Sequence, residues 1–143
     1  MGMRLFYAQS LSQQQITNSG GWDDIAGLSL TLPKQTGDET FALVTLNVPN
    51  PYAKGSNYPG CNFTIRVNSG IDQAVPVGCF TSFNKVADPA TPISSGRVPV
   101  TVVAKVPLDK HKPTAVQGSW QAIRGATAVV DSPCSISAVT GKG

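Results

Sequence analysis

The stretch GRVPVTVVAKV, residues 96–106, sets the pattern that decides the fold. Alternate positions hold Val98, Val100, Val102, Ala104 and Val106, so these residues share one face of a predicted strand. The polar residues between them, Arg97, Thr101 and Lys105, point to the opposite face. Pro99 has no backbone N–H to give to a neighbouring strand, and therefore predicts an edge strand or a strand start.

The same period of two recurs along the chain, between turns rich in glycine, proline and asparagine. TFALVTLNV is apolar on both faces and predicts a central strand, whereas NFTIRVN has one apolar and one polar face and predicts a half-exposed strand. Further strands are predicted in residues 4–11, 28–32, 77–83, 114–123, 127–131 and 134–139. Eight to ten short strands without a long amphipathic helix indicate an all-β sandwich or jelly roll of antiparallel strands, forming a single domain over residues 1–143.

Composition excludes several classes of partner. The net charge is only +3, and the basic residues are scattered, so nucleic acid is not expected to bind. No apolar stretch approaches membrane-spanning length, and the first residues do not form a signal peptide, so neither membrane insertion nor standard export is expected. Cys61, Cys79 and Cys134 lack metal-ligand spacing; one disulfide plus a free thiol and three buried thiols are both possible.

Few residues could support catalysis or hold a metal. The single histidine, His111, lies between two lysines in a predicted exposed turn. Asp23 and Asp24 are adjacent, but a surface turn explains them, and no third oxygen ligand is spaced for calcium. A glycosidase would need two carboxylates across a cleft, for which only Asp88 and Asp131 lie near the polar loops. We therefore expect no enzyme activity, no metal and no cofactor.

The predicted loops instead carry the groups that recognise a neutral sugar. A sugar offers hydroxyls that donate and accept, together with a C–H patch, so its site needs forked donors, small hydroxyl side chains and an aromatic ring. Arginine holds two adjacent oxygens with one rigid plane of donors. The loops near residues 49–60 and 86–96 and the neighbouring strand ends supply these groups as Tyr52, Tyr58, Thr81, Ser94, Ser95, Arg97 and Arg124. Taken alone, each of these residues also fits an ordinary polar turn or strand end.

Four motifs resemble a known family in order and spacing: LNVPNPYAKGSNYPG, GCFTSFNKV, SSGRVPVTVVA and GSWQAIRGATAVVDS. They are similar to the tumour-necrosis-factor-like lectin domain at the N-terminus of a bacterial two-domain superlectin, and the likeness runs over about residues 43–141. The resemblance implies a jelly roll of the tumour-necrosis-factor type that forms a trimer. It also implies fucoside binding, without calcium, at sites between neighbouring subunits.

The resemblance also assigns site residues. Arg97 and Arg124 would grip the ring oxygens of fucose from different subunits. The remaining carbohydrate-binding positions implied by the family are Tyr52, Thr81, Ser82, Ser94 and Ser95. Three positions depart from the family pattern, since Asn62 and Ser82 replace tyrosines and Val77 replaces an acidic residue. These departures predict an altered preference among fucosylated oligosaccharides.

The expected partners are other copies of the chain in a homotrimer and fucosylated oligosaccharides on host cell surfaces. Three sites on one trimer would bind such a surface together and support adhesion. The lectin would then act outside the cell or at its surface, reaching it from the cytoplasm by a non-standard route. The alternative is a jelly-roll structural or receptor-binding protein whose arginines make intersubunit contacts with carboxylates.

Overall fold

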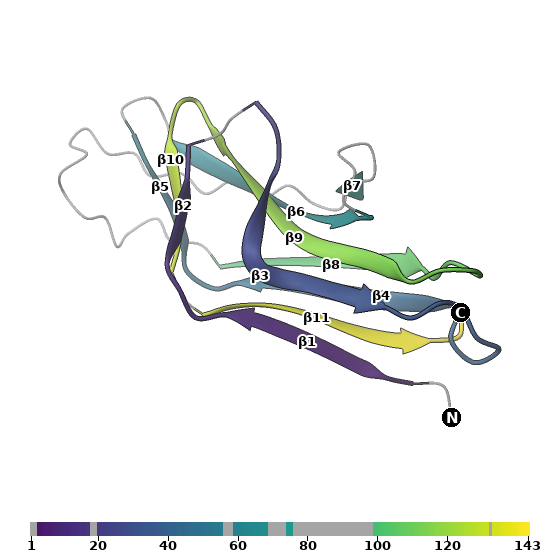
Figure 1. Ribbon diagram of the computed structural model, residues 1–143. Coiled ribbons are helices and arrows are strands. Elements are labelled where there is room, and N and C mark those ends of the chain that lie inside the picture. The colour runs from purple at the N-terminus through teal and green to yellow at the C-terminus, as the bar shows by residue number, and fades with distance from the viewer. Residues whose placement is uncertain (1–2, 18–19, 56–58, 69–73, 76–98, 132) are drawn as a thin grey trace.

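The computed structural model describes residues 3–17, 20–55, 59–68, 74–75, 99–131 and 133–143, with only the backbone described at 74–75. These residues form eleven strands and no helix (Figure 1). Every pair of neighbouring strands is antiparallel. The predicted all-β class is therefore confirmed.

The strands form two four-stranded sheets and one smaller sheet. Sheet A contains, in spatial order, β1 (Leu5–Ser10), β11 (Cys134–Gly141), β4 (Phe41–Val48) and β8 (Val100–Pro107). Sheet C contains β3 (Asp23–Leu32), β9 (Thr114–Ile123), β6 (Gly60–Val67) and β7 (Ala74–Val75). Sheet B contains β2 (Gln14–Ile16), β10 (Thr127–Val130) and β5 (Pro51–Lys54).

The chain passes back and forth between the two large sheets. Thus β3 lies in sheet C, β4 in sheet A, β6 in sheet C, β8 in sheet A, β9 in sheet C and β11 in sheet A. Neighbours in each sheet are therefore far apart in sequence, as in a jelly roll. Sheet B lies at one end of the sandwich, and both termini lie toward the other end (Figure 1). The predicted jelly-roll sandwich is confirmed.

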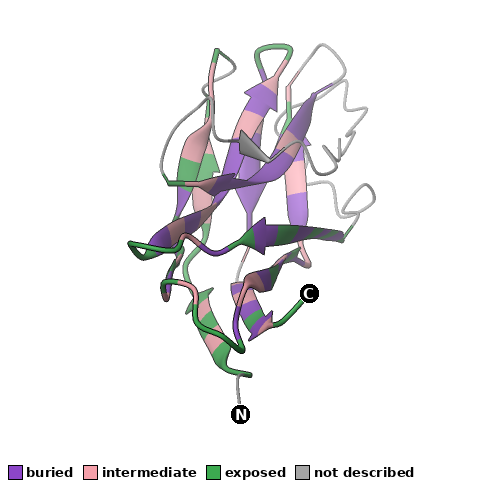
Figure 2. Cartoon of the chain, turned by 90° about the vertical axis from the view of Figure 1, so that its right-hand side faces the viewer, coloured by how far each residue is buried: buried purple, intermediate pink, exposed green. Residues whose placement is uncertain are grey.

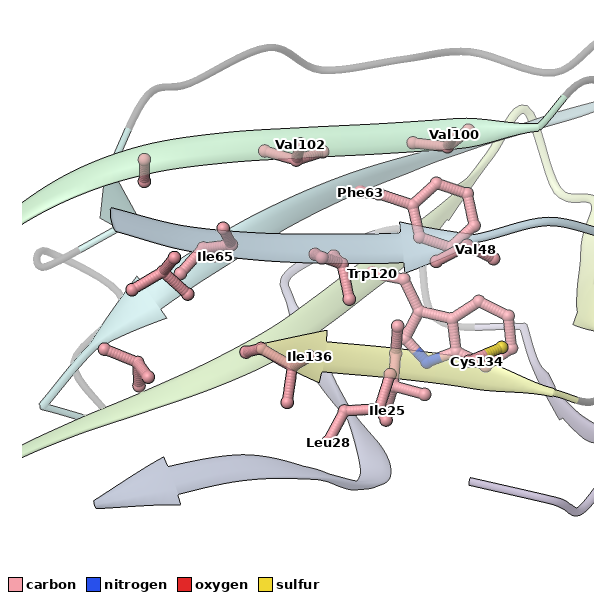
Figure 3. Packing of buried hydrophobic residues seen from close by; sticks show 14 of the residues in the cluster. Ile25, Leu28, Val48, Phe63, Ile65, Val100, Val102, Trp120, Cys134 and Ile136 are labelled. Atoms are coloured by element: carbon pink, nitrogen blue, oxygen red, sulfur yellow. The ribbon is translucent and has the colours of Figure 1, made fainter. Parts of the chain in front are cut away.

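The core lies between sheets A and C and follows directly from the alternating pattern (Figure 3). In β8 the side chains of Val100, Val102, Ala104 and Val106 are buried while those between them are exposed. On sheet C, Phe63 and Trp120 stack with their ring centroids 6.1 Å apart. Aromatic rings of this size bury much apolar surface, so this pair anchors the sheet C side of the core.

Several boundaries differ from the sequence prediction. β3 begins at Asp23, so Asp23 and Asp24 start a strand and the predicted surface turn is wrong. β5 lies within the predicted loop at residues 49–60, because pairing with β10 orders a segment that proline and glycine mark as a turn. β2 and β7 were not predicted, since two or three residues show no periodicity. The predicted strand 77–83 lies outside the described residues.

The outward faces of the two large sheets also differ from expectation. The expected half-exposed strand, β6, buries Thr64 and Arg66 on its polar side. The strand that is apolar on both sides, β4, leaves Leu43 exposed. Pro99 directly precedes β8, an edge strand of sheet A, as predicted. Figure 2 shows buried and exposed residues alternating along the sheet A strands.

Candidate carbohydrate site

Arg124 lies in a tight turn between sheet C and sheet B. β9 ends at Ile123, and the N–H of Ala126 donates to the Ile123 carbonyl at 3.2 Å. The two central residues have positive φ, 55° for Arg124 and 67° for Gly125. Two consecutive left-handed residues closed by this hydrogen bond form a type I′ turn. The turn holds Arg124 at the surface, where it is exposed.

The left-handed conformation is costly at Arg124. A residue with a Cβ atom loses roughly 1–2 kcal/mol in this region, whereas glycine does not. Gly125 thus adopts the left-handed conformation without strain, whereas Arg124 does not. Residues kept in such conformations are concentrated at functional sites. The turn therefore marks the R-G pair of the sequence as a candidate binding element.

Tyr52 lies on the neighbouring strand at the same end of the sandwich. In β5, Pro51 and Ala53 are buried, so Tyr52 and Lys54 point to the other side of sheet B, and Tyr52 is half-buried. Tyr52 pairs with Val129, two positions along from the pair of Lys54 and Thr127. β10 and the Arg124 turn are consecutive, so both predicted residues lie on adjoining elements (Figure 1).

Gly55 shows how closely the chain after β5 approaches that turn. A Cβ atom added there would lie 3.5 Å from the Cα of Ala126, the last residue of the turn. That distance is an ordinary van der Waals contact, so the P-Y-A-K-G motif packs beside the R-G turn. The two motifs thus lie together in the fold, although they are about seventy positions apart in the sequence.

The other five predicted site residues, Thr81, Ser82, Ser94, Ser95 and Arg97, lie outside the described residues, as do Tyr58, Val77 and Asp88. Their gathering around Tyr52 and Arg124 stays a prediction. Asn62, one of the three departures from the family pattern, is described on β6. Its Nδ2 donates to Oε1 of Gln121 at 3.0 Å, so the amide is tied to the neighbouring strand.

Sequence reasoning missed a polar network on the outward face of sheet C. Arg66 is 6% exposed, donates from Nε to Oγ of Ser119 at 2.8 Å, and forms an ion pair with Asp24. The Asp24 carboxylate also accepts hydrogen bonds from Gln117 and Ser119. Asp24 is thus the partner of a buried guanidinium and not part of a cation site. The polar face of NFTIRVN was the sequence signal for this network, but Asp24, the partner of Arg66, lies 42 positions away in the sequence.

Among the described residues, no three histidine, cysteine or acidic side chains gather where they could hold a metal ion. His111 is exposed, as predicted, and its backbone N–H donates to Oδ1 of Asp109 at 2.7 Å. Cys61 and Cys134 are both buried. Burial raises the pKa of the Cys134 thiol to about 11, so the thiol is un-ionised at neutral pH. Cys79 lies outside the described part of the chain.

The outward face of sheet A carries large apolar side chains among its polar ones. Its five large exposed side chains, with 37–78% of their surface accessible, are Leu5, Tyr7, Leu43, Val103 and Val139. Strand pairing aligns Leu5, Val139 and Leu43 in one row across three strands. The neighbouring row on the same face lies two residues further along each strand and consists of Tyr7, Ser137, Thr45 and Val103. We call these five residues the sheet A patch. Contiguous apolar surface of this kind marks an interaction site.

These features define a class of protein: a jelly roll of the tumour-necrosis-factor-like type, with an apolar sheet face and an arginine-bearing turn at one end. The chain belongs to the family of the Bc2l-C N-terminal domain, whose model matches residues 12–139. This is a family of lectin domains, and such domains are non-catalytic. The resemblance predicted from the four motifs is confirmed.

Comparison with curated proteins finds no match. Among solved structures, the chain is similar to part of dimeric latent PorU from Porphyromonas gingivalis, with a TM-score of 0.52 and 8% identity over 96% of the chain and 12% of PorU. It also matches VP2 of the infectious bursal disease virus subviral particle, with a TM-score of 0.46 and 13% identity over 98% of the chain and 38% of VP2. The chain thus spans a small part of either protein, and the first likeness concerns fold alone.

None of the described residues belongs to a helix long and apolar enough to cross a bilayer.

Proposed function

We propose that this chain is a calcium-independent lectin that binds fucosylated glycans at sites between neighbouring subunits of a homotrimer. Membership of a lectin family supports the carbohydrate-binding part of the proposal. The motif likeness supports fucose as the sugar. The lectin acts outside the cell or at its surface, where host glycans are found.

The observation that carries the proposal is the turn that presents Arg124. The left-handed backbone at Arg124 and Gly125 fixes the direction in which the Arg124 side chain leaves the main chain, at an exposed position. A guanidinium has five N–H donors in one plane and can bind two adjacent sugar oxygens together. Arg97, from the adjoining subunit, completes the grip in this proposal, while Tyr52 supplies an aromatic surface for the C–H face of the sugar.

The sheet A patch supports the trimeric part of the proposal. Leu43 and Val103 lie on the two strands β4 and β8, and both are more than two-fifths exposed. Burial of apolar area contributes roughly 25 cal/mol per Å², so packing this patch against other copies stabilises a closed oligomer. Three sites on one trimer then raise the avidity by about 10² to 10⁴ over one site when glycans can span them.

Asn62 supports a changed oligosaccharide preference. The family pattern has a tyrosine at this position, whereas here an amide side chain is hydrogen-bonded to Gln121. A short amide offers polar groups and little apolar area to a sugar adjoining the fucose. We therefore expect fucose itself to be retained and the favoured flanking sugars to differ.

The direct test is calorimetric titration of the purified protein with methyl α-L-fucoside, with and without EDTA. We expect binding with a Kd of roughly micromolar to millimolar, unchanged by the chelator. Arg124→Ala and Arg97→Ala should each weaken binding by about 10- to 100-fold, the effect of losing hydrogen bonds from a charged group. Tyr52→Ala should weaken it less.

Lys34→Ala serves as the matched control, since Lys34 is an exposed cation on the connection after β3. It should bind the fucoside as the unaltered protein does. A glycan array then identifies the flanking sugars. Full affinity in both arginine variants would contradict the proposed grip, and binding restored only by calcium would contradict the metal-free site.

A further inference from the structure

A cavity of about 410 Å³ lies at the end of the sandwich opposite the Arg124 turn. Its lining residues come from the ends of β6, β8 and β9 and the connection after β8, and they are Val67, Asn68, Val106, Pro107, Leu108, Asp109 and Thr114. Thr114 begins β9 and Arg124 follows its end, so the two sites are separated by about 30 Å of extended strand. The volume is within the range of small-molecule sites.

Two polar side chains on this cavity, those of Asn68 and Asp109, are held in place by hydrogen bonds, and each has a group left over for a ligand. Oδ1 of Asn68 accepts from the N–H of Ala115 at 3.1 Å, which directs the amide NH₂ away from β9. Oδ1 of Asp109 accepts from the backbone N–H groups of His111 and Lys112, at 2.7 and 3.1 Å, and its second oxygen has no partner in the described part of the chain.

Thr114 is the third polar group. It is 2% exposed, lines the cavity, and its hydroxyl makes no hydrogen bond to any described residue. Its oxygen is not one of the enclosed side-chain atoms that lack a partner among the described residues, so it is open to the cavity and can both donate and accept a hydrogen bond. Its presence here, where a valine would fill the same space, favours a hydrogen-bonding ligand.

The lining defines the class of ligand. An amide donor, a carboxylate acceptor and a hydroxyl that does both match a ring that carries several hydroxyls, while the aliphatic residues Val67, Val106 and Leu108 match its C–H groups. The Asp109 carboxylate disfavours an anion, and hydrogen bonds from His111 and Lys112 lower the pKa of Asp109, so it remains ionised. We propose that this cavity is a second site, separate from the fucoside site, that binds a neutral sugar.

The test is an amide-resolved NMR titration of the whole chain with the methyl glycosides of D-glucose, D-galactose and D-mannose, each up to about 50 mM. We expect at least one to shift the amide signals of Asn68, Asp109 and Thr114 with a Kd on the order of 1–10 mM. Methyl α-L-fucoside should instead shift the signals of Tyr52 and Arg124. The two sites are thereby distinguished within one experiment.

Two variants sharpen the assignment. Thr114→Val keeps the side-chain shape but removes the hydroxyl, and Asp109→Asn keeps the oxygen that caps the turn but removes the charge. Each should raise the Kd at least about tenfold, whereas Thr31→Val and Asp38→Asn, at exposed positions elsewhere, should leave it unchanged. The proposal is overturned if no glycoside shifts the cavity signals, or if both cavity variants bind as tightly as the unaltered protein.

Discussion

The outward faces of sheets A and C are opposites. Sheet A presents Leu43, Val103 and the rest of its patch to solvent, although these side chains are apolar. Sheet C buries Thr64, Arg66 and Ser119, although these side chains are polar. Both faces depart from the usual rule that a sandwich is apolar inside and polar outside.

The difference lies in where each face finds its partners. On sheet C, Arg66 is satisfied by Asp24 and Ser119 within the same chain, so the polar face is complete. On sheet A, the apolar patch has no covering element among the described residues. The polar face of sheet C is therefore satisfied by hydrogen bonds within the chain, whereas we propose that the sheet A patch packs against a second protein surface.

The largest expected effect comes from charging the sheet A patch. In Leu43→Lys an ammonium replaces the central apolar side chain, and its desolvation would oppose burial against another copy. We expect the trimer to dissociate, as measured by sedimentation equilibrium. Leu11→Lys is the matched control, because Leu11 is also an exposed leucine but lies on the connection between β1 and β2. If the Leu43→Lys protein remained trimeric, the sheet A patch would not be part of the subunit interface.

The next effect comes from breaking the sheet C network. Asp24→Ala removes the carboxylate and leaves the buried Arg66 charge with only Ser119 as partner. We expect the free energy of unfolding to fall by about 2–3 kcal/mol, measured by urea denaturation. Asp38→Ala, an exposed carboxylate, should change it by less than about 0.5 kcal/mol. Equal stability of the two variants would show that the polar face of sheet C does not depend on this ion pair.

Sheet A has a buried charge of its own at one end. Glu39 accepts hydrogen bonds from Arg4 and Thr140, and these lower the pKa of Glu39 below its usual 4.5. A carboxyl whose pKa is depressed on folding stabilises the protein above its unfolded pKa and loses that contribution as the pH falls through its folded pKa.

Glu39→Gln should therefore be less stable than the unaltered protein at pH 7 and should lose less stability on acidification. Urea unfolding at pH 7 and at about pH 3 measures both differences. A parallel loss of stability in the two proteins between these pH values would contradict the role of this carboxylate.

The smallest expected effect concerns the turn at the end of the sandwich. Gly125→Ala places a Cβ in open space but at a φ of 67°, so only backbone strain is added. We expect a loss of about 1 kcal/mol in unfolding free energy and weaker fucoside binding through a displaced Arg124. Gly37→Ala is the control, since its added Cβ also meets nothing and its φ is not in the strained range. Equal stability would show that the turn tolerates a side chain.

Much of the fold was predictable because most strands carry their own signal. The period of two predicted which residues of β6 and β8 face the core, and Pro99 located an edge. β5 was missed because its residues resemble a turn until β10 pairs with them. The burial of Arg66 was missed for a similar reason, since its partners lie 42 and 53 positions away and periodicity carries no information about them.

The candidate site was predictable only in part. The motifs located Tyr52 and Arg124, and the structure places them on adjoining elements at one end of the sandwich. The left-handed turn was not predicted, because Gly, Asn and Asp dominate the central positions of type I′ turns and Arg124 is none of these. The grip of Arg97 remains a prediction, as does its placement between subunits.

The central claim is that the sheet A patch joins three copies of this chain. Sedimentation equilibrium of the purified protein tests it most directly. The account predicts a single species with three times the 14.9 kDa mass of one chain. A species of 14.9 kDa at micromolar concentration would contradict it.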